Sequence, residues 1–448
     1  MMTIEQFGRR LRSRELTAVR VTEGCLRRID ADNPELNAFI SVMADQALRQ
    51  AREADQELAA GHDRGPLHGV PISIKDLLDI RGMATTAGSR VRDGHVAERD
   101  APAIAHLRQA GAVFVGKTNL HEFAFGTTNE DSAFGLARNP HDPTRSPGGS
   151  SGGSAISVAA GMALATIGTD TGGSIRIPAA ACGIVGLKPT LGDVSIDGVV
   201  PLSRTLDHIG PLTQSVTDAC LVYHALMGDA SAVPPAPMPM HGLRLAVPRK
   251  YFCDLLDDEV RARFEEALER LRAAGARVDE IEIHHAAEIA PVYLHLVMAD
   301  AAAYHAATLE SMPEKYTPNV RLRLEMGRYV LGEDYVRALA GRARITREVD
   351  AALAQHDALI LPSLPIPAPP LGASTVQVGA TAEPVRNLML RLTQPFNVTG
   401  HPAIAMPSGQ TMNKLPCSVQ LVGRRGQTDA LLRVALACEP QISGAAQA

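Results

Sequence analysis

The sequence predicts an α/β fold built around a largely buried β-sheet. Segments whose apolar residues recur at helical spacing alternate along the chain with short, continuous apolar runs. Such runs are typical of strands covered on both faces, and their alternation with helices is the pattern of an α/β protein. The chain has 448 residues, of which 45% are apolar and 21% charged, so it is apolar enough to bury a large core.

Residues 1–64 are predicted to form a helical N-terminal region. Apolar residues recur there near helical spacing, namely Leu16, Val19, Val21, Leu26 and Ile29. Residues 43–60 are rich in Ala, Glu and Arg, which favour a second helix.

The next region, residues 65–215, is rich in Gly, Ser and Thr. Its apolar runs predict strands over residues 70–74, 112–115 and 163–168. Helices are expected over residues 101–110 and 154–162.

A proline-rich stretch, residues 233–240, predicts an exposed connector. Beyond it, strands are expected over 243–247, 277–283, 358–361 and 403–406, and helices over 258–274, 291–310 and 333–355. The proline-rich segment 362–370 is predicted to be a surface loop. We expect a single domain over residues 1–448, in which 241–448 supply the rest of the sheet and the helices around a substrate pocket.

Charge and composition exclude several classes of protein. A net charge of −5, with seven Tyr, nine Phe and no Trp, disfavours binding to nucleic acid. The six cysteines are scattered, so we expect reduced, buried thiols and no zinc site. The N-terminal residues lack the apolar core of a signal peptide, and no run of about 18 apolar residues appears. We therefore expect a cytoplasmic protein that does not bind a membrane.

Residues 111–118 match the G-x-x-x-x-G-K-[ST] pattern of a phosphate-binding loop, with Lys117 as its lysine. In that motif a strand precedes a turn whose backbone N–H groups face the phosphates. Here the interior, Ala-Val-Phe-Val, predicts a strand, and a helix is predicted before it. The sequence context therefore disfavours a nucleotide-binding ATPase. That hypothesis would require the protein to bind ATP.

Residues 148–154, Gly-Gly-Ser-Ser-Gly-Gly-Ser, contain the G-x-S-x-G pattern of the α/β-hydrolase nucleophile elbow twice. An elbow needs a buried strand immediately before it, but residues 139–147 hold three prolines. An esterase with His208 or His401 as its base remains an alternative. It predicts that a histidine substitution abolishes activity while Lys75→Ala has a mild effect.

Lys75 follows the apolar strand predicted over 70–74, which carries its ammonium group toward the interior of the sheet. A salt bridge with Asp76 or Asp79 is the ordinary structural interpretation. If the group is instead buried among hydroxyls, desolvation lowers its pKa from ~10.4. A value of ~7–8 would allow it to act as a base at neutral pH.

Ser174 follows two glycines in the segment Asp-Thr-Gly-Gly-Ser over residues 170–174. Gly172 and Gly173 allow backbone N–H groups to face a ligand without interference from a Cβ atom. Donors placed in this way can stabilise an oxyanion. Ser150 could then pass a proton between Lys75 and Ser174, because a hydroxyl both donates and accepts.

These segments, in this order, resemble the amidase signature family of serine amidohydrolases. The similarity runs from residues 66–76 through 115–119, 148–154 and 170–178 to 186–190, and continues weakly through 206–211 and 396–403. It implies a large mixed β-sheet flanked by helices on both faces. It also implies a Ser–Ser–Lys triad in which Ser174 is the nucleophile, Ser150 the bridging serine after a cis Gly149–Ser150 peptide, and Lys75 the base.

The resemblance also implies the groups that bind the substrate. The backbone N–H groups of Thr171, Gly172, Gly173 and Ser174 would form the oxyanion hole. The substrate pocket would be lined by Ala124, Gly126, Thr127 and Thr128. Arg176 would either bind a substrate carboxylate or be structural, and Asp170 and Asp207 would hydrogen-bond the active-site loops. Neither a metal nor a cofactor is implied.

The function predicted is that of an amidohydrolase, which cleaves the C–N bond of a small carboxamide through an acyl-enzyme. The alternative is the A subunit of a tRNA-dependent amidotransferase, which has the same core and works in a multi-subunit complex. Residues 310–361 look more like those of stand-alone amidases. The expected partner is a small-molecule amide, and the resemblance points to a homodimer.

Overall fold

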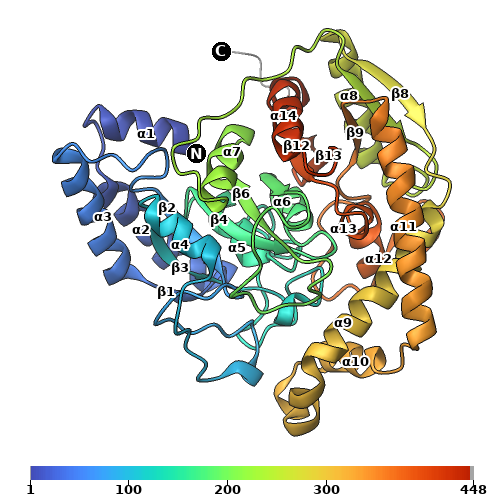
Figure 1. Cartoon of the computed structure of the whole chain (residues 1–448), viewed down its shortest axis with the longest axis horizontal. Helices are drawn as coiled ribbons and strands as arrows, with labels where there is room; N and C mark the ends of the chain where they lie inside the picture. Colours follow the sequence, from blue (N-terminus) through green and yellow to red (C-terminus); the bar gives the residue numbers. More distant parts are fainter. Residues whose placement is uncertain (1, 444–448) are drawn as a thin grey trace.

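The structure, a computed structural model, describes residues 2–443. In this part of the chain eleven strands form one mixed sheet, in the order β1-β3-β2-β4-β6-β5-β12-β13-β9-β7-β8, and β10 and β11 form a separate hairpin. Figure 1 shows that helices surround this sheet along its length. The prediction of an α/β fold with a large mixed sheet is confirmed.

Three parallel strands form the part of the sheet that carries the sequence motifs. β2 (Pro71–Lys75) lies between β3 (Val113–Thr118) and β4 (Ala165–Asp170) and is parallel to both. β1 (Phe39–Val42) adds an antiparallel edge beside β3. Each parallel strand starts in a predicted apolar run and continues into polar residues at its carboxyl end. The carboxyl ends of parallel strands are where α/β proteins commonly bind ligands.

Antiparallel strands connect this part to the rest of the sheet. β6 (His208–Thr213) pairs with β4 and with β5 (Val185–Lys188), and β5 pairs with β12 (Ala403–Gln410). The remaining strands are β13 (Pro416–Val422), β9 (Ala358–Pro362), β7 (Arg244–Pro248), β8 (Arg277–Ile281), β10 (Thr375–Val378) and β11 (Thr381–Pro384). The apolar pattern predicts β7, β8, β9 and β12 but does not predict β6. That strand contains Gly210 and Pro211, which disfavour strands, so its pairing partners determine its conformation.

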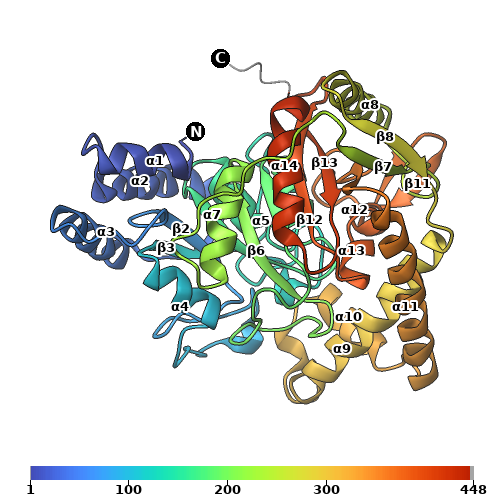
Figure 2. The same ribbon diagram turned by 45° about the horizontal axis from the view of Figure 1, so that its top comes forward.

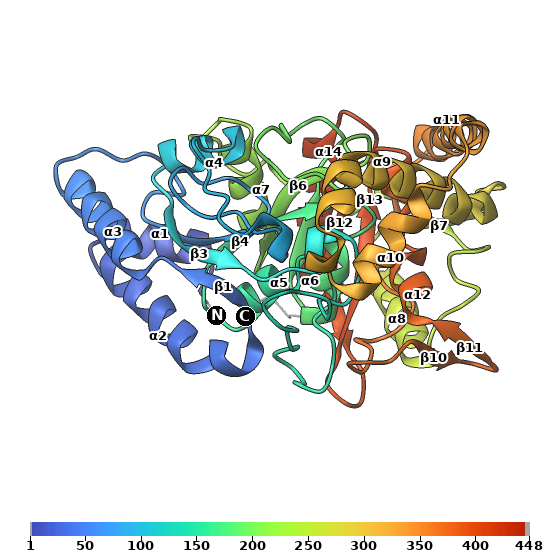
Figure 3. The same cartoon turned by 90° about the horizontal axis from the view of Figure 1, so that it is seen from below.

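Helices lie on both sides of the sheet. In Figure 3, α4 (Pro102–Gln109) and α7 (Val216–Leu226) lie on one side of β3 and β4, and α2 (Ala18–Leu36) lies on the other. The N-terminal region is helical, as predicted, over α1 (Ile4–Arg12), α2 and α3 (Ala44–Ala59). The other helices outside the centre are α8 (Asp258–Ala273), α12 (Val385–Arg391), α13 (Pro395–Val398) and α14 (Thr428–Ile442).

Three further helices, α9 (Ile289–Ser311), α10 (Pro318–Gly327) and α11 (Gly332–Ala354), pack together at one end of the molecule (Figure 2). The helical segment Ala286–Ser311 has 26 residues and contains an 18-residue stretch with a mean hydropathy of 1.2, so by length and composition it could cross a membrane. Half of its apolar stretch is buried inside the fold. Its packing against α10 and α11 accounts for this apolar character.

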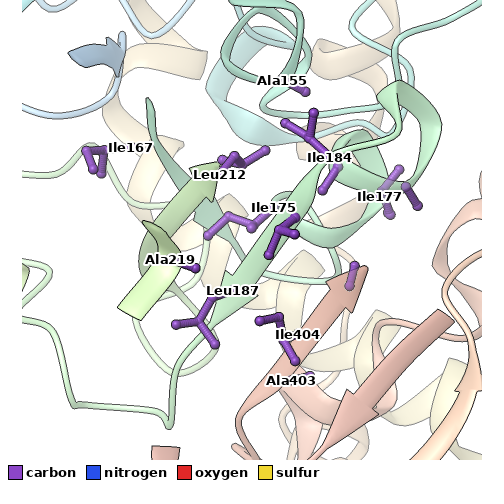
Figure 4. Close-up of a cluster of buried hydrophobic side chains, with 14 of the residues drawn as sticks. Ala155, Ile167, Ile175, Ile177, Ile184, Leu187, Leu212, Ala219, Ala403 and Ile404 are labelled. Atoms are coloured by element: carbon purple, nitrogen blue, oxygen red, sulfur yellow. The ribbon is translucent and has the colours of Figure 1, made fainter. Parts of the chain in front are cut away.

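α5 (Gly152–Ala159) and α6 (Arg176–Cys182) lie against the middle of the sheet and are almost entirely buried in the hydrophobic core. Figure 4 shows the side chains of Ala155, Ile177, Leu187, Leu212 and Ile404 converging there, and all five are fully buried. Each helix begins two residues after a candidate catalytic serine. The core therefore anchors the two segments that carry Ser150 and Ser174.

The prediction of a surface loop over residues 362–370 is wrong. Leu364, Ile366 and Ala368 are at most 5% exposed. The carbonyls of Pro365 and Pro369 accept hydrogen bonds from the backbone N–H groups of Asp257 and Ser146. Prolines exclude regular secondary structure, but they have no N–H group to leave unsatisfied and so tolerate burial. The connector over 233–240, in contrast, is exposed or half-buried, as predicted.

Candidate active site

Lys75, the last residue of β2, is surrounded by hydroxyl groups. Its Nζ atom lies 2.8 Å from Ser150 Oγ, 2.8 Å from Ser151 Oγ and 2.7 Å from Thr169 Oγ1. The side chain is fully buried, and burial lowers its pKa from 10.5 to about 7, although the carboxylates of Asp170 and Asp207 oppose the shift. Desolvation disfavours the ammonium form, and hydroxyls compensate for a charge less well than a carboxylate does. A pKa of about 7 is in the range that a general base needs at neutral pH.

Of the three hydroxyls around Lys75, that of Ser150 is the one whose sequence context points to proton transfer. The Ser151 hydroxyl donates to the Thr169 carbonyl at 3.2 Å, so its proton is already in use. Ser150 Oγ makes its one side-chain hydrogen bond within residues 2–443 with Lys75. Ser151 and Thr169 were not predicted as neighbours of Lys75. The signal for them was weak, because each is simply next to a residue of a recognised motif.

The segment that carries Ser150 lies directly against the 124–128 loop. The Gly149–Ser150 peptide bond is cis, as the resemblance implies. A Cβ atom on Gly149 would lie 2.9 Å from the carbonyl carbon of Thr127 and the backbone nitrogen of Thr128. Only glycine can approach another backbone this closely. Gly149 therefore allows the serine segment and the predicted substrate loop to pack together.

Ser174 ends a turn between β4 and α6 and is 6% exposed. The Ser151 N–H group donates to the Ser174 carbonyl at 3.3 Å, which holds the two serine segments side by side. Within residues 2–443, none of the N–H groups of residues 171–174 donates a hydrogen bond. Gly173 has a φ of 138°, in a region that favours glycine, and this conformation turns the backbone within the run. Four consecutive free donors beside a serine can stabilise an oxyanion.

The two ends of this turn are clamped by a buried ion pair. Arg176 Nη2 lies 3.0 Å from Asp170 Oδ1, and its Nε donates to Asp170 Oδ2 at 3.1 Å. The other donors of Arg176 are used by Asn397 at 2.7 Å and Gln420 at 3.1 Å. Burial alone would raise the pKa of Asp170, but the Arg176 guanidinium holds it far below its usual range.

Arg176 is therefore a structural residue, and its assignment as a possible ligand of substrate is wrong. Its side chain is fully buried, and all its bonds are to residues of the fold. The position of Arg176 in the sequence does not distinguish a substrate ligand from a structural residue, because either could follow the 170–174 segment.

Asp207 holds the start of the same turn. Its carboxylate accepts hydrogen bonds from Thr171 Oγ1 at 2.6 Å and from the backbone N–H groups of Leu202 and Ser203. Burial raises the pKa of Asp207 to about 6, while these donors and Lys75 oppose the shift. Asp170 and Asp207 thus position the loop, as expected from the sequence.

The 124–128 loop begins with an unusual backbone conformation. Phe123 and Ala124 have φ values of 50° and 58°, a left-handed region that non-glycine residues adopt at a cost of ~1–3 kcal/mol each. The Ala124 carbonyl accepts no hydrogen bond within residues 2–443. At Gly126, a Cβ atom would clash with the imidazole of His121. The loop is buried at Ala124 and Thr127 and lies beside Gly149, so the structure brings it to the serine segment.

Within residues 2–443, neither His208 nor His401, the two candidate bases of an α/β-hydrolase mechanism, contacts a serine of this site. His208 Nε2 lies 3.2 Å from Lys188 Nζ, and His401 Nε2 lies 3.0 Å from Asp350 Oδ1. In the described residues no group of three or more His, Cys, Asp or Glu side chains could hold a metal ion.

Lys117, the lysine of the phosphate-loop pattern, is a structural residue. β3 spans the interior of that pattern, and α4 precedes it, as the sequence predicts. Lys117 Nζ lies 2.6 Å from Asp76 Oδ1 and donates to the Ala84 carbonyl at 3.1 Å. Asp76 is thus paired with Lys117, and Lys75 is left without a carboxylate partner in contact among the described residues.

Comparison with known proteins places this site in a family. A family model for amidases matches residues 20–432. The chain belongs to the amidase family. An amidase of Pseudomonas putida is 39% identical over 452 residues, covering 98% of this chain and 95% of the relative. A crystal structure of an amidase, 38% identical, matches with a TM-score of 0.93 over 98% of this chain and 100% of that one.

The amidase family also includes components of larger assemblies. The A subunit of the glutamyl-tRNA(Gln) amidotransferase of Carboxydothermus hydrogenoformans is 36% identical over 475 residues, covering 98% of this chain and 96% of the relative. The two named activities are represented at similar identity. Membership of the amidase family therefore supports chemistry at a C–N bond and does not by itself separate the two functions.

Proposed function

We propose that this protein is a stand-alone amidase that hydrolyses a small carboxamide through an acyl-enzyme on Ser174. The observation that carries the proposal is the buried amine of Lys75, with a pKa of about 7, in contact with the Ser150 hydroxyl at 2.8 Å. Both groups lie beside a serine and a run of four free N–H donors. This set of groups provides a base, a relay, a nucleophile and an oxyanion site.

In the first half of the reaction, neutral Lys75 takes a proton from Ser150 as Ser150 takes one from Ser174. The Ser174 oxygen attacks the amide carbonyl, and the oxyanion accepts hydrogen bonds from the N–H groups of residues 171–174. The hydrogen bond from Ser174 to Ser150 is not among those of residues 2–443, so the mechanism requires it to form when substrate binds. The C–N bond then breaks, and the proton held on Lys75 passes back through Ser150 to the leaving amine.

In the second half, water replaces the amine. The same relay takes a proton from the water, which attacks the acyl carbonyl, and returns it to Ser174 as the ester bond breaks. The products are a carboxylate and ammonia or an amine, and Lys75 is neutral again at the end of the cycle.

The experiment that tests the proposal is an ammonia-release screen of the purified full-length chain against a library of primary amides. We expect turnover of at least one amide, together with a Ser174 ester intermediate detected by mass spectrometry after rapid acid quenching. Ser174→Ala should show neither. Turnover by Ser174→Ala at the rate of the unchanged protein would refute the assignment.

A second candidate function is that of an amidotransferase A subunit, which the 36% identity to such a protein favours. The two candidates differ in what the chain needs. A stand-alone amidase hydrolyses simple amides without other proteins, whereas a component of a complex is expected to need its partners. Lack of turnover by the isolated chain, restored by the other proteins of an amidotransferase complex, would favour the second candidate.

A further inference from the structure

Arg386, in α12, is a charged side chain near the site that has no counter-charge among the described residues. It is half-buried, and within residues 2–443 it makes neither a hydrogen bond nor an ion pair. Its guanidinium carbon lies 5.8 Å from the centre of the Phe125 ring. Arg391, at the other end of the same helix, instead donates to the Tyr251 carbonyl at 2.7 Å.

Arg386 lines a cavity of about 520 Å³, two of whose lining side chains pack against the 171–174 turn. Tyr293 and Leu390 line the same cavity. A Cβ atom on Gly172 would lie 2.7 Å from Tyr293 Cζ and 3.0 Å from Leu390 Cδ2. On its other side, Arg386 lies over Phe125, which belongs to the 124–128 loop. The guanidinium therefore lies over a residue of one loop that the proposed function assigns to the substrate, and it shares a cavity with two side chains that contact the other.

The surroundings of Arg386 do not neutralise its charge. Burial lowers the pKa of Arg386, and Tyr293 opposes this shift. The neighbouring Arg323 donates to the Phe125 carbonyl at 2.6 Å. Burial and the nearby charge of Arg386 lower the pKa of Arg323 to about 10. Glu383 lines the cavity but forms no ion pair in the described part of the chain. A partly buried guanidinium without a counter-charge is destabilising, and an anion in the cavity would compensate for it.

We infer that Arg386 binds a carboxylate of the substrate, so that the amide hydrolysed by this enzyme also carries a carboxylate group. The planar guanidinium offers parallel N–H donors that match the two oxygens of a carboxylate. The cavity supplies the space, and its lining residues Tyr293 and Leu390 lie against Gly172 in the turn whose donors face the scissile carbonyl in the proposed mechanism. The inference rests on the proposed function and specifies its substrate class.

The test compares two substrates of nearly the same shape. Succinamate carries a carboxylate, and 4-methylpentanamide carries an isopropyl group in its place. For the unchanged protein we expect kcat/KM to be at least tenfold higher for succinamate. Arg386→Met should lower this ratio at least tenfold, chiefly through a higher KM for succinamate. Arg386→Lys should give an intermediate ratio, because it keeps the charge but loses the paired donors.

The matched control is Arg424→Met, which makes the same change at another half-buried guanidinium, one that is bonded to the backbone carbonyls of Leu353 and His356 and does not line this cavity. Its ratio should stay within about twofold of that of the unchanged protein. Because both substrates are measured on one preparation, a variant that is only partly folded still gives a valid ratio.

Two failures are distinguishable. If the protein hydrolyses the two amides with equal kcat/KM, and Arg386→Met leaves the ratio of the two values unchanged, the inference is wrong and the proposed function stands. If neither amide nor any member of the library is hydrolysed by the unchanged protein, the proposed function and the inference fail together.

Discussion

The pH dependence of turnover should follow the loss of a proton from Lys75. The pKa of this group is about 7 because it is fully buried, against an ordinary value of 10.5. Only the neutral amine can accept a proton, so kcat/KM for a neutral amide should rise about tenfold per pH unit below pH 6 and level off above pH 8. At pH 6 we expect about a tenth of the plateau value.

The same shift predicts a stability effect of definite sign. A pKa of about 7 in place of 10.5 corresponds to about 5 kcal/mol against the charged form in the folded protein. Between pH 7 and pH 10.5 the unfolded chain binds more protons than the folded one, so the free energy of unfolding rises with pH in this range. Below pH 7 Lys75 is protonated in both states and contributes no pH dependence. Relative to Lys75→Met, the unchanged protein should therefore gain about 2 kcal/mol from pH 7 to pH 9 in urea unfolding.

Two matched substitutions separate catalysis from structure. Lys75→Arg keeps a positive charge that cannot be removed, so it should be inactive at every pH. Lys117→Arg makes the same change at a buried lysine that is paired with Asp76. The midpoint of its kcat/KM profile should stay near pH 7, because Lys117 takes no part in the proposed proton transfer. A kcat/KM that is constant between pH 6 and 9 would refute the assignment of Lys75 as the base. So would activity in Lys75→Arg.

Three further substitutions test the rest of the site. Ser174→Ala should lower ammonia release by roughly 10³-fold or more, with an unchanged thermal midpoint, because only the nucleophile is lost. Gly173→Ala should lower kcat roughly 10²-fold or more, because its φ of 138° and its contact with Thr393 leave no place for a Cβ atom and the N–H donors must move. Arg176→Met should lower the free energy of unfolding by about 3–5 kcal/mol, measured in urea, because it leaves the Asp170 carboxylate buried without its partner. Full stability in that variant would contradict the clamp described above.

Much of the site could be predicted from the sequence because its motifs are local. The run before Lys75 is apolar except for Ser73, and this pattern predicts a buried strand. The glycines before Ser174 indicate a turn that exposes N–H groups. The contact between Lys75 and Ser150, which is 2.8 Å long, was implied by the resemblance to the amidase signature family. The structural role of Arg176 could not be predicted from the sequence, because two of its hydrogen-bond partners, Asn397 and Gln420, lie more than two hundred positions away.

By itself, the sequence determined the α/β class, most of the strands with continuous apolar runs, and which residue types could carry the chemistry. Only the tertiary structure decided that β6 lies between β4 and β5 and pairs with both, that residues 362–370 are largely buried, and that Asp76 forms an ion pair with Lys117. It also decided that Arg386 has no counter-charge within residues 2–443. The physical reason is that backbone propensity and periodicity are properties of neighbouring residues, whereas burial and the pairing of charges are set by segments that meet only after the chain has folded.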